Sequence, residues 1–159
     1  NTDKILKAMY VAAGIGQIIA TRSSISGAAG GCQAEVGSAS SMAAGALTYL
    51  QGGNCKQIAT AAAMAMKNLL GLVCDPVAGL VEVPCVKRNV IGTVNAMACA
   101  DMAMAGITSR IPPDQVMDAM KEVGDKMDAS LRETALGGLA RTEEGVKIAE
   151  KMHASQENW

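Results

Sequence analysis

Apolar residues along this chain recur every three or four positions, and no segment alternates between apolar and polar residues over any length. The first spacing is typical of helices that bury one face, and the missing alternation argues against β-strands. The clearest stripe begins after Pro113, which suits a first helical position, and consists of Val116, Ala119, Met120, Val123 and Met127. The patterning therefore predicts an all-α fold, a compact helical bundle, with a surface helix in this segment.

Further helices are predicted at residues 3–22, 32 to about 50, 54–72, 90–106 and 142 to about 153, with a short piece at 131–140 that Gly137 and Gly138 end. Asn54 and Gln57 have the spacing of a capping box. Thr142 is expected to cap the last helix. Range 90–106 is apolar on nearly all sides, which predicts a central buried helix. The first helix is expected to be buried on much of its circumference through Leu6, Met9, Ala13, Ile15, Ile18 and Ile19.

Residues 71–89 interrupt the helical pattern near the middle of the chain. Pro76 and Pro84 prevent this segment from forming one helix, because proline breaks a helix interior. The same segment carries Cys74 and Cys85. We interpret it as a loop with metal chemistry, held in place by the helices around it.

The composition allows one packed domain. Half of the 159 residues are apolar, but there is no Phe, one Trp and two Tyr. The core must therefore consist of Ala, Met, Leu, Val and Ile, with Gly where helices approach closely. We expect a single helical catalytic domain over residues 1–159. Its abrupt, apolar beginning suggests that it is a fragment or one subunit of a larger enzyme.

Charge and cysteine content narrow the function classes. A net charge of −1 gives no basic footprint for nucleic acid, and no uninterrupted apolar run reaches transmembrane length. An odd number of cysteines, five, without a signal peptide favours a cytoplasmic protein with reduced thiols.

The cysteines do not follow a common metal-binding spacing. No two are separated by only two residues, so spacing alone favours buried structural thiols. Cys32, Cys74 and Cys85 nevertheless lie on or beside irregular, Gly- or Pro-rich backbone, which raises the case for a metal site. Cys55 and Cys99 fall within helical patterns and are expected to be inert thiols.

Two further groups could hold a small anionic substrate. A Gly/Ser-rich turn that leads into a helix presents free backbone N–H groups, and here it includes Ser24, Ser26, Gly27 and Gly30. Arg88 and Asn89 follow Cys85 at an expected helix start. The alternatives, a tight turn between helices and ordinary solvated charge, remain open.

Three stretches together resemble the α chain of the iron–sulfur-dependent L-serine dehydratases: SISGAAGGCQAEVGSASSMAAG, GLVCDPVAGLVEVPCVKRN and LRETALGGLA. The resemblance covers nearly the whole chain. It implies an ammonia-lyase that converts L-serine to pyruvate and ammonia without pyridoxal phosphate. It also implies a 4Fe–4S cluster bound by Cys32, Cys74 and Cys85, with one iron left open to act as Lewis acid on the substrate hydroxyl.

The family pattern is incomplete here. Its single-chain members carry an extra β domain with further histidines, and that portion is absent here. Some members end in a cysteine, whereas this chain ends in Asn158 and Trp159. We expect a β domain or β subunit as partner, and a homodimer is possible.

The identity of the catalytic base stays open. The only histidine, His153, lies far from the loops discussed above, so a β portion is expected to supply the base. Within this chain the weak candidates are Glu35, Asp75 and Glu82. Two other functions remain as alternatives, a related cysteine desulfidase and a non-catalytic helical interaction module.

Overall fold

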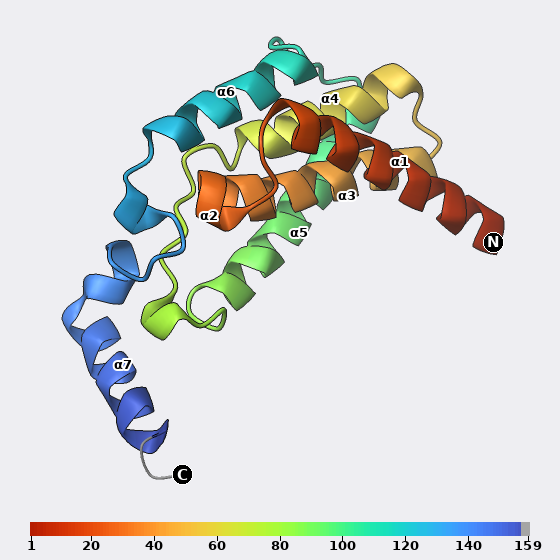
Figure 1. The fold of residues 1–159 in the computed structure, drawn as a ribbon. Helices are drawn as coiled ribbons and strands as arrows, with labels where there is room; N and C mark the ends of the chain where they lie inside the picture. The colour runs from red at the N-terminus through yellow and green to blue at the C-terminus, as the bar shows by residue number, and fades with distance from the viewer. Residues whose placement is uncertain (157–159) are drawn as a thin grey trace.

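The structure, a computed structural model, describes residues 1–156, and in this range it forms seven α-helices and no β-strand (Figure 1). The helices are α1 (Thr2–Arg22), α2 (Gly27–Gly30), α3 (Ser38–Leu50), α4 (Cys55–Lys67), α5 (Cys85–Met104), α6 (Pro113–Lys126) and α7 (Glu143–Gln156). A π-helix, η1 (Gln33–Gly37), leads into α3. Three 3₁₀ turns, η2 (Val77–Gly79), η3 (Ala129–Leu131) and η4 (Gly138–Arg141), lie in the loops. The predicted all-α fold is confirmed, and the chain end at Asn158 and Trp159 lies outside the described residues.

Helices α3 and α4 form the centre of the bundle. Helix α3 packs against α1, α4 and α5, and every residue from 60 to 66 of α4 is buried. The packing depends on small side chains, as the composition predicts. A Cβ atom at Gly45 of α3 would run into the Ile15 side chain of α1, so glycine sets how closely these two helices approach.

The prediction that range 90–106 is a central buried helix is wrong in two respects. Helix α5 begins at Cys85, and it lies with its large side chains outward: Val90, Ile91, Val94 and Met97 are 55–60% exposed. Its buried residues are Gly92, Ala96, Cys99, Ala100 and Ala103. Small residues face the bundle because they allow the helices to approach closely, so the row of small residues marks the buried face.

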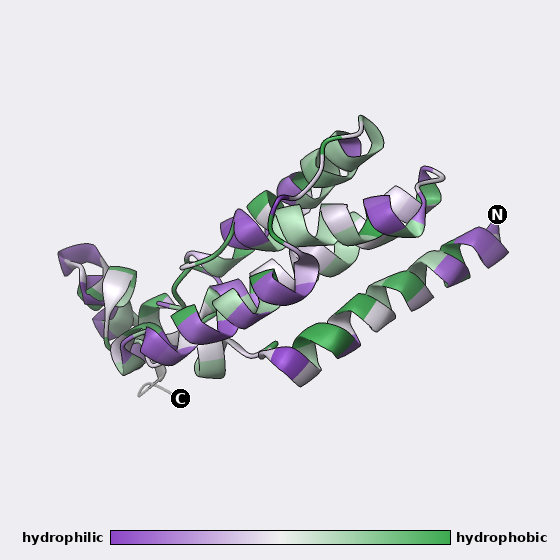
Figure 2. Ribbon diagram, turned by 90° about the horizontal axis from the view of Figure 1, so that it is seen from above, coloured by the Kyte–Doolittle hydropathy of each residue, from purple (hydrophilic) through white to green (hydrophobic). Residues whose placement is uncertain are grey.

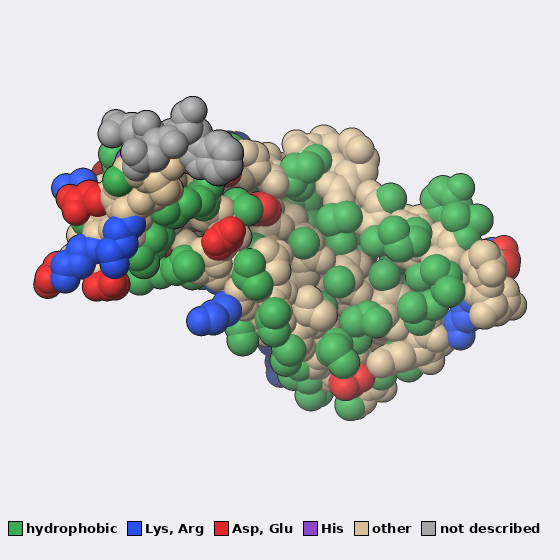
Figure 3. Space-filling view, turned by 90° about the horizontal axis from the view of Figure 1, so that it is seen from below, with side chains coloured by type: hydrophobic (Ala, Val, Ile, Leu, Met, Phe, Trp, Pro, Cys, Tyr) green, Lys and Arg blue, Asp and Glu red, His purple; other side chains and the backbone are tan. Residues whose placement is uncertain are grey.

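Helix α1 also buries mainly small residues and exposes most of its large apolar side chains. Ile19 is buried and Ile15 is half-buried, but Leu6, Met9, Ala13 and Ile18 are exposed, contrary to the prediction. The buried face is Ala8, Ala12, Gly16 and Ile19. Figure 2 shows hydrophobic residues along most of α1 between its polar ends, and Figure 3 shows many hydrophobic side chains on the face seen from below.

Several local signals are confirmed. The Asn54–Gln57 capping box is present in both directions, and Pro113 occupies the first turn of α6. The Thr142 hydroxyl accepts a hydrogen bond from the Gly145 N–H at the start of α7. The prediction that Gly137 and Gly138 end a helical piece is wrong, because the 3₁₀ turn η4 begins at Gly138. Helix α4 ends at Lys67, five residues before the predicted limit of 72.

The segment after α6 packs on the central loop. Helix α7 contacts η2 and η4 and extends away from the bundle (Figure 1). Among residues 1–156, none of the helices combines the length and apolar character that crossing a membrane requires.

Candidate metal centre

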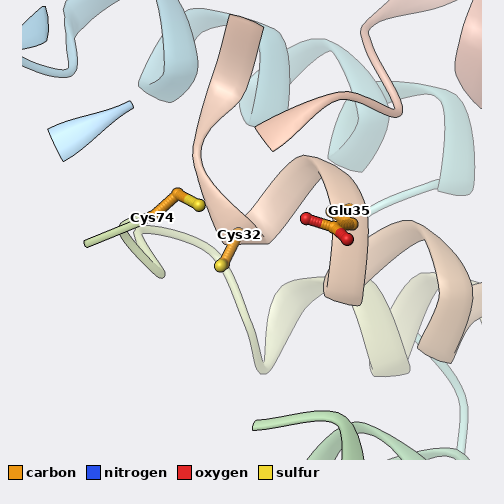
Figure 4. A group of neighbouring side chains, drawn as sticks. All are labelled: Cys32, Glu35 and Cys74. Atoms are coloured by element: carbon orange, nitrogen blue, oxygen red, sulfur yellow. The ribbon is translucent and has the colours of Figure 1, made fainter. Parts of the chain in front are cut away.

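Cys32 and Glu35 come from the start of the helix that becomes α3. Cys32 immediately precedes η1, and Glu35 lies three residues further along it. π-Helical turns are rare and are often found at functional sites. The Cys32 side chain is buried and Glu35 is exposed. Figure 4 shows Cys32 and Glu35 on this helix and Cys74 on the neighbouring loop, with its thiol directed towards Cys32.

Backbone hydrogen bonds hold Cys74 in place. Its N–H donates to the Leu131 carbonyl at 2.8 Å, and its carbonyl accepts from the Glu133 N–H at 2.9 Å. Together these bonds make a short parallel bridge between Cys74 and Arg132. The 131–133 segment therefore fixes the cysteine from a position almost sixty residues later in the chain.

Gln33 ties Cys32 to the same loop. Its side chain is buried, and its amide oxygen accepts from the Gly71 N–H at 2.9 Å. The Gln33 backbone N–H donates to the Leu72 carbonyl at 2.8 Å. The amide nitrogen donates to the Met120 carbonyl of α6 at 2.9 Å. One side chain thus satisfies polar backbone groups of two other segments, which is what a buried amide requires.

The buried Asp75 and the half-buried Arg88 form an ion pair beside the thiols. Arg88 Nη1 donates to Asp75 Oδ1 at 2.7 Å and to the Val73 carbonyl at 2.8 Å, and it lies 4.0 Å from Cys32 Sγ. Asp75 Oδ2 accepts from the Leu139 N–H at 2.8 Å. Gly138 makes this approach possible, because a Cβ there would overlap the Asp75 side chain. Both oxygens of Asp75 are therefore engaged in holding the loops together.

The thiols lie close enough to influence one another electrostatically. Burial, a hydrogen bond with Cys32 and the nearby charges of Cys32, Glu133 and Cys85 raise the pKa of Cys74 from 9.0 to about 12. Burial and the charge of Cys32 also raise the pKa of Cys85, while Arg88 acts in the opposite direction. The raised pKa values keep these thiols protonated in the metal-free protein, and a bound cation would displace the protons and stabilise the thiolates.

The donor set fits a metal centre. Cys32 Sγ, Cys74 Sγ and a carboxylate oxygen of Glu35 all lie within 4.8 Å of one another. Cys85, half-buried at the start of α5, is outside this group of three, but the charges of Cys32 and Glu35 both act to raise the pKa of its thiol. Thiolates bind iron–sulfur clusters and zinc, and two thiols from separate segments, Cys32 and Cys74, lie together here.

The Gly/Ser-rich turn is divided between two places. Gly27 lies at the thiols, since a Cβ there would be 3.3 Å from Cys74 Sγ and 3.1 Å from Glu35 Oε2. Ser24 and Gly30 instead line a hollow of ≈ 210 Å³ against α6, where a Cβ at Gly124 would lie 3.0 Å from Gly30 Cα. The Ser24 hydroxyl accepts from the Ser26 N–H at 3.1 Å and shapes the turn.

Of the two predicted substrate-binding residues that follow Cys85, Arg88 contacts Cys32 and Asp75, whereas the Asn89 side chain contacts the Cys85 carbonyl. Asn89 is exposed, and its side chain donates to the Cys85 carbonyl at 3.0 Å. Glu82 and His153 are also exposed, and His153 lines a hollow between α7 and η2 together with Ala78.

Sequence reasoning missed Glu133. It adopts a left-handed backbone conformation, φ 65°, which is uncommon for a residue with a side chain. Its carboxylate lies near Gly27, opposite Glu35, where a Cβ on Gly27 would be 3.3 Å from Glu133 Oε2. The only available signal was an acidic residue inside the LRETALGGLA stretch. The hydrogen bonds that the Gln33 side chain makes with Gly71 and Met120 leave no signal in the hydrophobic periodicity.

Fold and site together define a helical protein in which two cysteines and a glutamate, beside a central loop that a C-terminal segment holds, could bind a metal. The family model described as serine dehydratase alpha chain matches residues 1–140. This chain belongs to that family.

Individual relatives agree with the family. The chain is 57% identical over 150 residues to the probable L-serine dehydratase alpha chain of Bacillus subtilis (strain 168), which covers 94% of this chain and 50% of that protein. It is 57% identical over 148 residues to the corresponding probable alpha chain of Latilactobacillus sakei, covering 93% and 71%. It is 48% identical over 141 residues to the L-serine dehydratase of Streptomyces coelicolor, covering 88% and 31%. The chain thus spans half the length of the first of these relatives and less than a third of the last.

Proposed function

We propose that this chain is the catalytic helical portion of an ammonia-lyase that converts L-serine to pyruvate and ammonia. The observation that carries the proposal is the pairing of Cys32 and Cys74 beside Arg88, with Cys85 near enough to respond to the charge of Cys32, in a member of the serine dehydratase alpha chain family. The three cysteines are the residues that would hold a 4Fe–4S cluster. Such a cluster, when bound, supplies a Lewis-acidic iron for the hydroxyl group of serine.

The chain's own groups position the substrate. Arg88 is fixed by Asp75 and Val73 through Nη1, so its guanidinium stays next to Cys32 and offers a positive charge for the serine carboxylate. Gly27 keeps the backbone side of the site open, because any side chain there would meet Glu35 and Cys74. In this proposal Ser24, Ser26 and Gly30 shape the turn that presents Gly27, and Asn89 supports the Cys85 backbone.

Removal of the α-proton needs a base, and the contacts of Asp75 and Glu35 bear on which of them could serve. Asp75 uses both oxygens to hold Arg88 and Leu139, so accepting a proton would cost it those contacts. Glu35 is exposed beside the thiols and is the better placed of the two. Since the only histidine, His153, lines another hollow, we keep the proposal that a β portion brings the base.

The partner is proposed to be a β domain or β subunit, because two of the relatives are named alpha chains. The exposed apolar side chains of α1 and α5 offer it a contact surface (Figure 3). A homodimer through the same face is the competing arrangement. The five cysteines are all free, which accords with a reducing, cytoplasmic location for this domain.

The experiment is to reconstitute the chain without air and compare pyruvate release from L-serine with sulfide release from L-cysteine, before and after adding a separate β portion. We expect little turnover alone and a large gain in pyruvate formation on addition. Sulfide release in place of pyruvate would favour a cysteine desulfidase. A loaded centre without turnover of either substrate in the complex would overturn the proposed activity.

One variant tests the substrate position. Arg88→Lys keeps the charge but loses the planar guanidinium, so we expect a KM for serine raised by about tenfold or more. Arg110→Lys, an exposed arginine after α5, is the matched control and should leave KM unchanged. An unchanged KM in Arg88→Lys would remove Arg88 from the substrate site.

A further inference from the structure

Three potential ligand atoms lie close enough together to surround one metal ion, and they are a different set from the three cysteines of the cluster. They are Cys32 Sγ, Cys74 Sγ and a Glu35 carboxylate oxygen. We propose that Cys32, Glu35 and Cys74 form a binding site for a single zinc-like divalent ion. The ion occupies this site when the protein does not hold a cluster. This site goes beyond the proposed serine chemistry and does not depend on it.

The spacing suits a mononuclear site. A tetrahedral zinc ion with bonds of about 2.3 Å to sulfur and about 2.1 Å to oxygen holds its ligand atoms about 3.6–3.8 Å apart. The three atoms here already lie within 4.8 Å of one another, so small side-chain rotations bring them to that geometry. Thiolates bound to different irons of a cluster lie further apart, because an iron–iron edge and two iron–sulfur bonds separate them.

The three ligands are supported by the surrounding structure. Cys32 and Glu35 are three residues apart on one helix, a spacing that metal sites in helical bundles also use. Cys74 is fixed by the Leu131 carbonyl and the Glu133 N–H. Gly27 leaves room beside both Cys74 and Glu35. Glu35 is on the exposed side, so a water molecule can complete four-coordination there, as in zinc sites with three protein ligands.

The two metal states share Cys32 and Cys74 and therefore exclude each other. Only Glu35 is specific to the single ion, and only Cys85 is specific to the cluster. Neither residue is in the buried core, since Glu35 is exposed and Cys85 is half-buried. Substituting one or the other can therefore separate the two states without removing a core side chain.

The experiment titrates the reduced, cluster-free chain with Co²⁺ in the absence of air and follows the thiolate-to-cobalt absorption and the visible bands of tetrahedral cobalt. Wild type should bind one Co²⁺, and Zn²⁺ should displace it. Glu35→Gln should weaken binding by at least about tenfold, since even residues that only support a metal ligand cost that much. Cys85→Ser should bind Co²⁺ as wild type does.

Controls and a second readout complete the test. Glu133→Gln and Cys55→Ala should titrate as wild type, because Glu133 lies nearby but outside the ligand group and Cys55 is exposed on α4. In reconstitution with iron and sulfide, the pattern should reverse: Glu35→Gln should form the cluster and Cys85→Ser should not. Zn²⁺ added beforehand should suppress cluster formation in wild type.

Two results would overturn the proposal. One is loss of Co²⁺ binding in Cys85→Ser with normal binding in Glu35→Gln, which would mean that three thiols hold the ion. The other is cobalt absorption that survives both Cys32→Ala and Cys74→Ser, which would place the ion elsewhere. Because serine turnover is not measured, neither result bears on the proposed activity.

Discussion

Two buried cysteines in this molecule have very different surroundings. Cys99 lies inside α5, fully buried between helices, where its thiol faces Asn95 Oδ1 at 3.6 Å and the Asn68 amide at 3.5 Å. Cys74 is also buried, but it lies on a loop held by residues 131–133, with Cys32 and Glu133 close by. Burial alone therefore does not distinguish a thiol that packs from a thiol that can bind a metal.

The difference lies in how each site is built. The surroundings of Cys99 come from helices whose small residues pack closely, in a cluster that includes Ala61, Ala65 and Ala96. The surroundings of Cys74 come from polar contacts between distant segments, above all Asp75 with Arg88 and Leu139. The first holds one thiol, on which the positive charge of Lys67 acts, whereas the second collects several groups that can become negative. Cation binding is expected only at the second.

The largest expected contrast is loss of the cluster. Replacing Cys32, Cys74 or Cys85 with Ala should abolish the broad visible absorption after anaerobic reconstitution, because each thiol is a proposed ligand. Cys55→Ala and Cys99→Ala should retain it. A cluster that survives Cys74→Ala but not Cys99→Ala would reverse the comparison.

The second contrast is thiol reactivity. The pKa of Cys74 is raised to about 12 from an ordinary 9.0, so at pH 8 the reactive thiolate is about a thousandfold rarer than for an ordinary thiol. In the metal-free protein, its alkylation rate should rise with pH and still be rising about tenfold per unit at pH 10. Mass spectrometry of alkylated peptides measures this site by site. A rate that levels off near pH 9 would contradict the raised pKa.

The third contrast is between two ion pairs. Asp75→Asn leaves Arg88 half-buried without its charge partner, and we expect the free energy of unfolding to fall by about 3 kcal/mol. Asp118→Asn breaks the exposed pair with Arg22 and should cost much less, because water screens that pair. Urea denaturation of both variants measures the two changes in the free energy of unfolding. Equal costs would mean that the Asp75 contacts do not hold the loops together.

The smallest effect tests the helical region. Asn54→Ala removes the cap of α4 and should lower the free energy of unfolding by about 1 kcal/mol. The cluster should form normally, because Asn54 lies at the far end of α4 from the thiols. If this variant loses iron, the two regions are coupled more strongly than their contacts indicate.

The same comparison explains what the sequence could predict. Helices were predictable where the signal is local, such as the capping box at Asn54, Pro113 at the start of α6 and the stripe through Val116 and Met120. The buried face of α5 was not, because the prediction followed large apolar residues such as Val94, whereas the structure buries the small ones.

The centre was predictable only in part. Cys32, Cys74 and Cys85 were selected by loop context and by family resemblance. The structure places Cys32 and Cys74 in one group with Glu35, and the binding of a metal by all three cysteines stays a prediction. The position of Glu133 and the role of Gln33 were not predictable, because both depend on hydrogen bonds between segments far apart in the chain. Periodicity carries no information about such contacts.

The central claim is that the three thiols hold an iron–sulfur cluster. Its most direct test is the iron and acid-labile sulfide content of the chain purified and reconstituted without air. We predict about four iron and about four sulfide per chain, as a 4Fe–4S cluster contains. Protein that folds normally but retains neither iron nor sulfide after reconstitution would contradict the account.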